Sequence, residues 1–198
     1  EMVYPHYLAP TPAMAVVQFQ PDLTEGALAE GFTIPRQSAL RSQLGKGEQT
    51  PCEFRTSHEV TLWPLEVTEA EYIVNSSALP RINDPHLPTA KAGFRIRLRT
   101  TAGLTFDALS LEQLPVYIRG SDEFPMHVYE QMLGKSIAMV AQSTSESTTW
   151  QQVIDRSHIQ RVGFNEQEAM LPYGAQSFSG YRLLHEYFAF PNGYLFIN

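Results

Sequence analysis

Hydrophobic and polar residues alternate most regularly over residues 93–101, which read GFRIRLRTT. Successive side chains of a β-strand point to opposite faces, so this period of two predicts a strand. One face of that strand would be apolar and would carry Phe94, Ile96 and Leu98. The other face would be basic and would carry Arg95, Arg97 and Arg99.

The stretch 31–67 also favours β structure, because short apolar runs alternate there with turns that contain glycine or proline. We predict strands over 31–35, 52–56 and 60–63 and a turn over 45–50. A continuous apolar run at 13–19 has the length and the β-branched pair of a buried strand. Strands are also expected over 159–164 and 194–197, whereas residues 66–72 are acidic and weakly patterned.

Two segments have the spacing of a helix. The first begins at Ser121, carries acidic residues and Pro125 in its first turn, and ends near Gly134. Strands predicted at 114–119 and 136–141 flank it, so residues 114–141 form a strand-helix-strand unit. The last helix is predicted over 180–188, with Tyr181, Leu184 and Phe188 as its inward-facing stripe.

Together these elements predict a strand-rich α+β fold in two small lobes. The clearest change in composition falls at residues 75–92, which are rich in Pro, Ser, Asn and Asp. We therefore expect a mainly β lobe over residues 1–74, a connecting loop over 75–92, and an α+β lobe over 93–198.

Composition narrows the class of protein. A chain of 198 residues with 43% hydrophobic content can form one large domain or two small ones. Its formal net charge of -7 disfavours nucleic-acid binding, and its apolar runs are too short to cross a bilayer. The single cysteine, Cys52, excludes an internal disulfide and fits a reducing compartment. The chain starts within an apolar, proline-punctuated segment and ends on an apolar strand, so we expect a piece of a longer protein.

No motif in the sequence predicts a reaction, a metal or a cofactor. No two of the six histidines are three to five residues apart, and a single cysteine cannot form a CxxC pair. The run at 45–48, GKGE, lacks the spacing of a phosphate-binding loop and favours a simple turn. The pair His185–Glu186 suggests general-base chemistry, but its position beside the apolar stripe favours a half-buried packing histidine.

Two features are candidates for a protein interface. Arg95, Arg97 and Arg99 would place three like charges about 7 Å apart on one strand face, which is unfavourable unless water or acidic groups answer them. A solvated outer face accounts for such a run, and so does a docking strip for an acidic surface of another subunit. Trp63 ends a strand before Pro64, which makes it a candidate for an exposed aromatic anchor.

Sequence blocks along nearly the whole chain resemble the TssF family, also called ImpG or VasA, of type VI secretion baseplate subunits. The blocks that carry this resemblance lie at 4–8, 10–12, 14–19, 31–36, 52–56, 61–65, 98–101, 120–121, 129–133, 161–164, 171–173, 180–184 and 186–191. The stretch 31–67 also resembles the G-x-x-I-P-x-G-T … F-x-T signature of contractile-phage baseplate wedge proteins. Gln37-Ser38 replaces the usual Gly-Thr, which bears on the turn after Pro35 and leaves the strand pairing unaffected.

The resemblance implies a structural subunit without catalytic residues or cofactors. Such a subunit pairs with a second TssF copy, binds TssG, and forms a wedge with TssE and TssK. Six wedges surround the spike hub and form the platform on which the tube and sheath assemble. It implies a cytoplasmic location, at the inner face of the inner membrane when the baseplate is docked.

Two other functions stay open from the residues alone. One is a hydrolase-type or lyase-type enzyme with a dispersed site near His185 and Glu186. The other is a β-type module that binds carbohydrate or peptide through Trp63. A deep pocket with convergent polar groups favours the enzyme, whereas broad apolar and charged surfaces favour the assembly subunit.

Overall fold

The computed structural model describes residues 4–21, 28–47, 49–82, 84, 89–101, 103–144, 150–174 and 177–198. In this part of the chain, short antiparallel strands pair into five two-stranded sheets, and two α-helices accompany them. This composition confirms the predicted strand-rich α+β class. No helix among these residues has both the length and the apolar character needed to cross a membrane.

The chain divides into two compact units, each made of several sequence segments. The first unit contains residues 1–64, 102–112 and 162–194, and the second contains 65–101, 113–161 and 195–198. Residues 75–92 therefore lie inside the second unit, between two strands that pair with each other. The units thus differ from the lobes 1–74 and 93–198, because strand pairing joins segments that composition separates.

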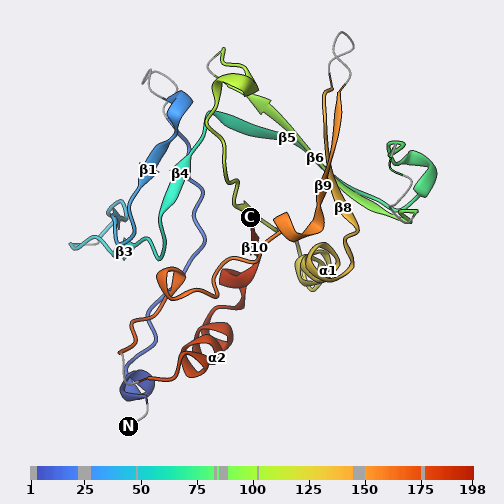
Figure 1. Ribbon diagram of the computed structural model, residues 1–198. Helices are drawn as coiled ribbons and strands as arrows, with labels where there is room; N and C mark the ends of the chain where they lie inside the picture. Colours follow the sequence, from blue (N-terminus) through green and yellow to red (C-terminus); the bar gives the residue numbers. More distant parts are fainter. Residues whose placement is uncertain are drawn as a thin grey trace. The chain divides into compact units, whose positions relative to one another are not determined.

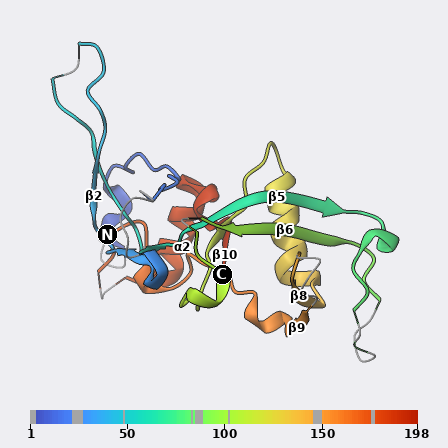
Figure 2. The ribbon, with the colours of Figure 1, turned by 90° about the horizontal axis from the view of Figure 1, so that it is seen from above.

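The first unit combines two small sheets with the longer helix (Figure 1). The strands β1 and β4 pair, and β2 and β3 form a hairpin arm that extends from this unit in Figure 2. The elements are β1 (Phe32–Ile34), β2 (Ala39–Arg41), β3 (Glu53–Arg55), β4 (Val60–Leu62) and α2 (Ser179–Ala189). The strands predicted at 31–35, 52–56 and 60–63 are confirmed.

The turn after Pro35 is held by the threonine of the F-x-T signature, Thr56. In this turn Gln37 has a φ of 68°, which lies in the left-handed region that favours glycine. The hydroxyl of Thr56 donates to the carbonyl of Pro35 at 2.9 Å and accepts from the amide of Ser38 at 3.1 Å. Gln37 thus adopts the conformation that the signature assigns to glycine.

The second unit is organised around a long two-stranded ribbon of β5 and β6. Figure 2 shows these strands side by side, with α1 crossing them. The remaining sheets are β7 with β10 and β8 with β9. The elements are β5 (Leu65–Ile73), β6 (Gly93–Thr100), β7 (Val116–Tyr117), α1 (Phe124–Glu130), β8 (Ala138–Gln142), β9 (Gln151–Asp155) and β10 (Phe196–Ile197).

The core of the second unit forms where α1 meets β7, β10 and the ribbon. Ile118, Val128 and Ile197 are its buried centre, and Phe94 of β6 packs against them. Pro125 lies in the first turn of α1, as predicted, and a π-helical turn, Gln131–Lys135, continues this helix to the strand β8. The apolar face of β6 therefore contributes Phe94 to the core, in agreement with its period-two pattern.

Two predicted strands are wrong, and the strand β5 was not predicted. Residues 13–19 form no strand because no neighbouring strand pairs with them, and Val17 is 56% exposed. Residues 159–164 contribute only a single bridge, Arg161 to Ile197, and the strand there is β9, a few residues earlier. The acidic stretch 66–72 is part of β5, the longest strand, because its glutamates face the arginines of β6.

The left-handed conformation of Gln37 predicts that glycine is a better residue there. A side chain in this region costs about 1 kcal/mol, and the greater chain entropy of glycine offsets part of the gain. We expect Gln37→Gly to raise the free energy of unfolding by a few tenths to about 1 kcal/mol in denaturant titrations. Gln37→Ala keeps the Cβ and serves as the control. A stabilisation by Gln37→Ala as large as that by Gln37→Gly would contradict this account.

Candidate protein interface

The helix α2 is anchored by a buried ion pair. Arg182 and Glu186 are four residues apart, lie on one face of the helix, and are both 0% exposed. A guanidinium nitrogen, Nη1 of Arg182, donates to Oε2 of Glu186 at 2.9 Å. The two charged groups of this helix therefore point into the first unit rather than into water.

The carboxylate of Glu186 is satisfied by four donors. Its Oε1 accepts from the backbone amides of Met170 at 2.9 Å and Leu171 at 2.8 Å. Its Oε2 accepts from Arg182 and from the hydroxyl of Tyr194, each at 2.9 Å. A buried carboxylate is tolerated only when its hydrogen-bonding capacity is met, so this arrangement fixes the loop at 170–171 and Tyr194 relative to α2.

The guanidinium of Arg182 is held from several sides as well. Its Nη2 donates to the carbonyl of Phe164 at 3.2 Å, and its Cζ lies 5.4 Å from the centroid of the Tyr173 ring. Burial raises the pKa of the Tyr194 hydroxyl above its ordinary value, and the negative charge of Glu186 raises it further. The pKa of Tyr4 is raised for the same two reasons, burial first and the charge of Glu186 second.

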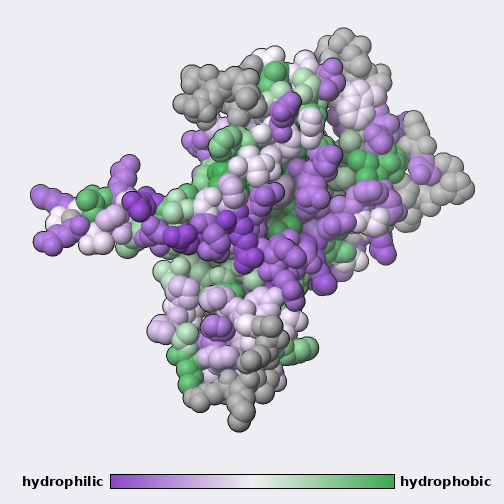
Figure 3. Space-filling view, turned by 60° about the vertical axis from the view of Figure 1, so that its left-hand side comes forward, coloured by the Kyte–Doolittle hydropathy of each residue, from purple (hydrophilic) through white to green (hydrophobic). Residues whose placement is uncertain are grey.

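The orientation of α2 contradicts the predicted inward stripe. Tyr181, Leu184 and Phe188 are 47%, 58% and 80% exposed, so they face outward. The reason is that Arg182 and Glu186 occupy the inner face and have partners there that the helix sequence does not show. Figure 3 shows hydrophobic side chains reaching the surface of the protein among hydrophilic ones. The apolar stripe of α2 therefore did not identify the buried side of this helix.

The pair His185–Glu186 does not have the arrangement of a general base. The half-buried ring of His185 is hydrogen-bonded through Nδ1 to the hydroxyl of Tyr4 at 3.0 Å and through Nε2 to that of Thr11 at 3.2 Å. Glu186 is enclosed and fully used by the contacts described above. His185 thus links the amino-terminal segment to α2, as the predicted half-buried packing histidine would.

The arginines of β6 face glutamates of β5 across the ribbon. The register places Glu66 opposite Arg99, Glu69 opposite Arg97 and Glu71 opposite Arg95. Arg97 and Glu69 are 2.9 Å apart, and the other two opposite pairs are also in ion-pair contact. We call these six residues the ionic ladder. Its charges balance, so the arginines do not form the unanswered basic strip that the strand alone suggests.

The opposite face of the same ribbon is apolar. The register pairs Val67 with Leu98, Ala70 with Ile96, and Tyr72 with Phe94. A bulge between Val67 and Glu69 shifts the register by the extra residue Thr68, whose hydroxyl donates to the carbonyl of Arg97 at 3.2 Å. Between Glu66 and Tyr72, the ribbon is therefore ionic on one face and apolar on the other.

Trp63 is half-buried and packs against Gly31, which has a φ of 79°. A Cβ on Gly31 would lie 3.1 Å from the Trp63 ring, so the ring depends on glycine at that position. The indole nitrogen of Trp63 is buried and has no hydrogen-bond partner among the described residues. Trp150, by contrast, is 51% exposed. Trp63 therefore contributes to packing within its own unit, and its predicted role as an anchor for a partner stays a prediction.

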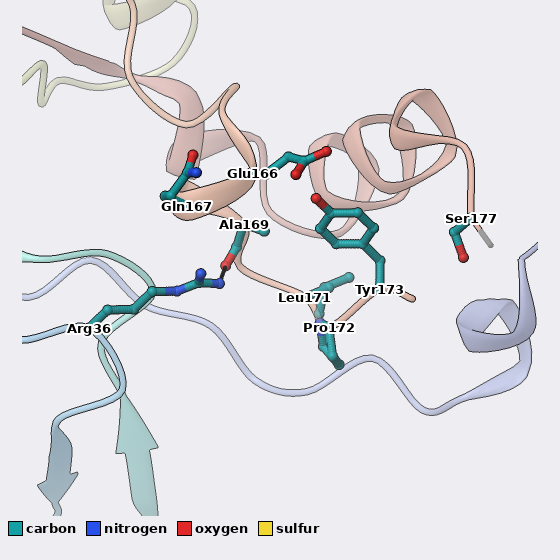
Figure 4. Close-up of a pocket in the computed structure, with 8 residues that line it drawn as sticks. All are labelled: Arg36, Glu166, Gln167, Ala169, Leu171, Pro172, Tyr173 and Ser177. Carbon is teal, nitrogen blue, oxygen red and sulfur yellow. Dashed lines mark hydrogen bonds between the residues drawn. The ribbon is translucent and has the colours of Figure 1, made fainter. Parts of the chain in front are cut away.

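A pocket of about 690 Å³ lies between the turn at Arg36 and the loop that follows residue 165. Figure 4 shows Arg36 reaching this loop, where Nη2 donates to the carbonyl of Ala169 at 2.9 Å. The hydroxyl of Tyr173 points toward Glu166. Removal from water raises the pKa of Tyr173, and the hydrogen bond and negative charge of Glu166 raise it further. The lining residues are Arg36, Glu166, Gln167, Ala169, Leu171, Pro172, Tyr173 and Ser177. No histidine is among the described residues that line the pocket, so Ser177 has no imidazole partner there.

The described residues contain no group of three or more His, Cys, Asp or Glu side chains that could hold a metal ion. Cys52 is exposed on the hairpin arm. The structure thus contains two surfaces of different character, one in each unit. One is the uncharged outer side of α2, and the other is the ionic ladder.

The importance of Arg182 and Glu186 is the main feature that sequence reasoning missed. A signal was present, because an Arg and a Glu four residues apart can pair along one face of a helix. The spacing does not tell a solvated pair from a buried one, since the difference depends on donors at residues 170, 171 and 194. Glu69 and Glu71 have the same spacing of two as the arginines of β6 and could have indicated partners for them, whereas Glu66 is out of phase because of the extra residue Thr68.

Known proteins match this chain over its whole length. The family described as Type VI secretion system, TssF, matches residues 1–198. The type VI secretion system component TssF1 of Pseudomonas aeruginosa strain PAO1 is 50% identical over 197 residues, which cover 100% of this chain and 32% of that protein. The chain therefore spans about a third of the length of this relative.

A solved structure has a similar fold. It is a chain of the type VI secretion system TssK-TssF-TssG baseplate subcomplex, determined by cryo-electron microscopy. Its TM-score is 0.75 and its sequence identity 23%, with 99% of this chain and 34% of that chain covered. At this identity the likeness establishes a shared fold.

The buried ion pair predicts strong and coupled effects of substitution. Glu186→Gln leaves a buried arginine without its counter-charge and should lower the free energy of unfolding by about 3–5 kcal/mol. Arg182→Met should cost a similar amount, and the double variant much less than the sum of both. Denaturant titrations of the four proteins measure this coupling.

The matched control for this cycle is Glu123→Gln, which removes the carboxylate of an exposed i,i+4 pair with His127. It should change the free energy of unfolding by less than about 0.5 kcal/mol. Additive losses from Arg182→Met and Glu186→Gln would show that the pair does not act as a unit.

The ionic ladder predicts an effect that depends on charge balance and salt. Changing Arg95, Arg97 and Arg99 to Gln leaves three glutamates uncompensated and should destabilise the protein by about 1 kcal/mol at low salt. Changing Glu66, Glu69 and Glu71 to Gln as well should recover most of this loss. Near 1 M NaCl the difference should largely disappear, since the Debye length there is about 3 Å. Thermal melts at two ionic strengths test this, and equal stability of both variants at low salt would refute the ladder as a stabilising element.

Proposed function

Since the chain belongs to the TssF family of type VI secretion proteins, we propose that it is part of a structural subunit of the baseplate wedge. Such a subunit forms a platform for the assembly of the contractile tail, tube and sheath, around the spike hub. The observation that carries this proposal is the family match over residues 1–198, together with 50% identity to a TssF1 protein. The function is one of binding and positioning other subunits.

The partners proposed for the whole protein are TssG, TssK, TssE and a second TssF copy. TssK and TssG are named with TssF in the baseplate subcomplex whose chain shares this fold. We further propose a cytoplasmic location, with docking at the inner face of the inner membrane through the assembled baseplate. The hub, sheath and tube would meet this subunit through the wedge as a whole.

We propose that the subunit is not an enzyme. The pair suggested for catalysis is engaged in the fold itself, since Glu186 accepts four hydrogen bonds and His185 has partners at both ring nitrogens. A general base must be free to reach a substrate proton. The geometry therefore supports a structural role for both residues.

The ionic ladder enters this proposal as a charge-matched surface. A partner that docks there would meet alternating arginines and glutamates rather than three free positive charges. Such a surface favours a partner with a complementary alternation of charge. Arg95, Arg97, Arg99 and Trp63 remain proposals as interface residues.

Co-purification of the full-length protein tests the proposed function. Tagged full-length protein is co-expressed with the TssG and TssK of the same organism and analysed by size-exclusion chromatography with light scattering. We expect one complex that contains all three proteins. Elution of the full-length protein by itself, when folded and present with both partners, would refute the baseplate role.

The same assay measures the contribution of the ladder. The variant with Gln at all six ladder positions keeps the charge balance and is compared with the wild-type protein. If the ladder is an interface, the six-Gln variant should retain its melting temperature and lose partner binding by about tenfold or more, as desolvated charge pairs at an interface do. Unchanged binding would remove Arg95, Arg97 and Arg99 from the interface.

A further inference from the structure

The outer face of α2 carries five large apolar or aromatic side chains. We define this face by the residues Phe178, Tyr181, Leu184, Tyr187 and Phe188, which are 66%, 47%, 58%, 45% and 80% exposed. The rings of Phe178 and Tyr181 are 5.7 Å apart, and those of Tyr187 and Phe188 are 5.6 Å apart. The side chains thus form neighbouring contacts rather than scattered single exposures.

This face has no formal charge. The only charged residues between Ser179 and Ala189 are Arg182 and Glu186, and both are turned inward. A helix that faces water ordinarily carries charged side chains on its outer side. An uncharged aromatic surface of this kind marks a place where another part of a protein packs.

The size of the face favours an occupant from the same polypeptide. Five side chains at about half exposure offer on the order of 500 Å². A stable interface between separate proteins buries roughly 800 Å² on each partner. A tethered segment needs less area because its effective concentration reaches the millimolar range.

A distant segment of the chain is already bound to α2. Tyr4 is only 8% exposed, its ring centroid lies 6.2 Å from that of Tyr181, and its hydroxyl contacts His185. Tyr4 and His185 are 181 positions apart in the sequence. The helix therefore already packs against a segment that is distant in sequence, beside the exposed face. The matched TssF1 protein has about two thirds of its length outside the region that matches this chain.

From these observations we infer that the outer face of α2 is covered, in the full-length polypeptide, by a segment that lies outside residues 1–198. The segment presents aliphatic or aromatic side chains without charge at the contact, since α2 offers no counter-charge there. It supplies hydrogen-bond acceptors at its rim for the hydroxyls of Tyr181 and Tyr187. This inference does not depend on the proposed baseplate function.

Site-specific labelling of the full-length protein tests the inference. Leu184→Cys is placed in a Cys52→Ser background, and the control is Gln43→Cys on the exposed hairpin arm in the same background. Reaction with N-ethylmaleimide is followed peptide by peptide by mass spectrometry, so other cysteines do not interfere. We expect Leu184→Cys to react at least about tenfold more slowly than Gln43→Cys in dilute protein without partners.

The protection should be the same at about 0.1 μM and about 10 μM protein, because an intramolecular contact does not follow mass action. Equal labelling of both sites would show that the face is free and would overturn the inference. Protection only at the higher concentration would assign the face to a second copy, and protection only after TssG or TssK is added would assign it to that partner. Phe188→Cys repeats the measurement, so a folding defect of one variant does not decide the outcome.

Discussion

The ion pair between Arg182 and Glu186 is the constraint on which the first unit depends. Two charges are removed from water there, and backbone amides, backbone carbonyls and Tyr194 supply hydrogen bonds to the carboxylate and to both terminal nitrogens of the guanidinium. The contacts reach from α2 to the loop at 164–171 and to Tyr194, which lies shortly before the final strand. The carboxylate of Glu186 thus connects α2, the loop at 170–171 and Tyr194.

In the second unit the arrangement of the chain is specified by exposed ion pairs instead of a buried one. Its ribbon carries charges on one face, where each arginine meets a glutamate, and contributes Phe94 from the other face to the core beside α1. A shift of register by one residue would place Arg97 on the apolar face and lose every ion pair at once. The ladder therefore specifies alignment, even though each exposed pair contributes little to stability.

Local pattern predicted much of the fold. The strands β1, β3, β4 and β6 and both helices follow from alternation, proline and glycine, because these signals act within a few residues. The turn at Gln37 was also located correctly, since the departure from the phage signature falls on the residue with positive φ. Pattern failed at β5 because its glutamates look like a polar linker until Arg95, Arg97 and Arg99 are placed opposite them. It failed again on α2, where hydrophobicity predicted the wrong side as buried. The side that is buried is determined by long-range hydrogen bonds to Glu186.

In α2 the residues that anchor the helix and the residues that form its exposed surface are different, and this has an evolutionary consequence. Anchoring uses positions 182 and 186, whereas the exposed surface uses positions 181, 184, 187 and 188. Selection can therefore act on the two sets separately. Diverging lineages can exchange the outward-facing side chains together with whatever packs on them, while the internal anchor keeps the helix in place.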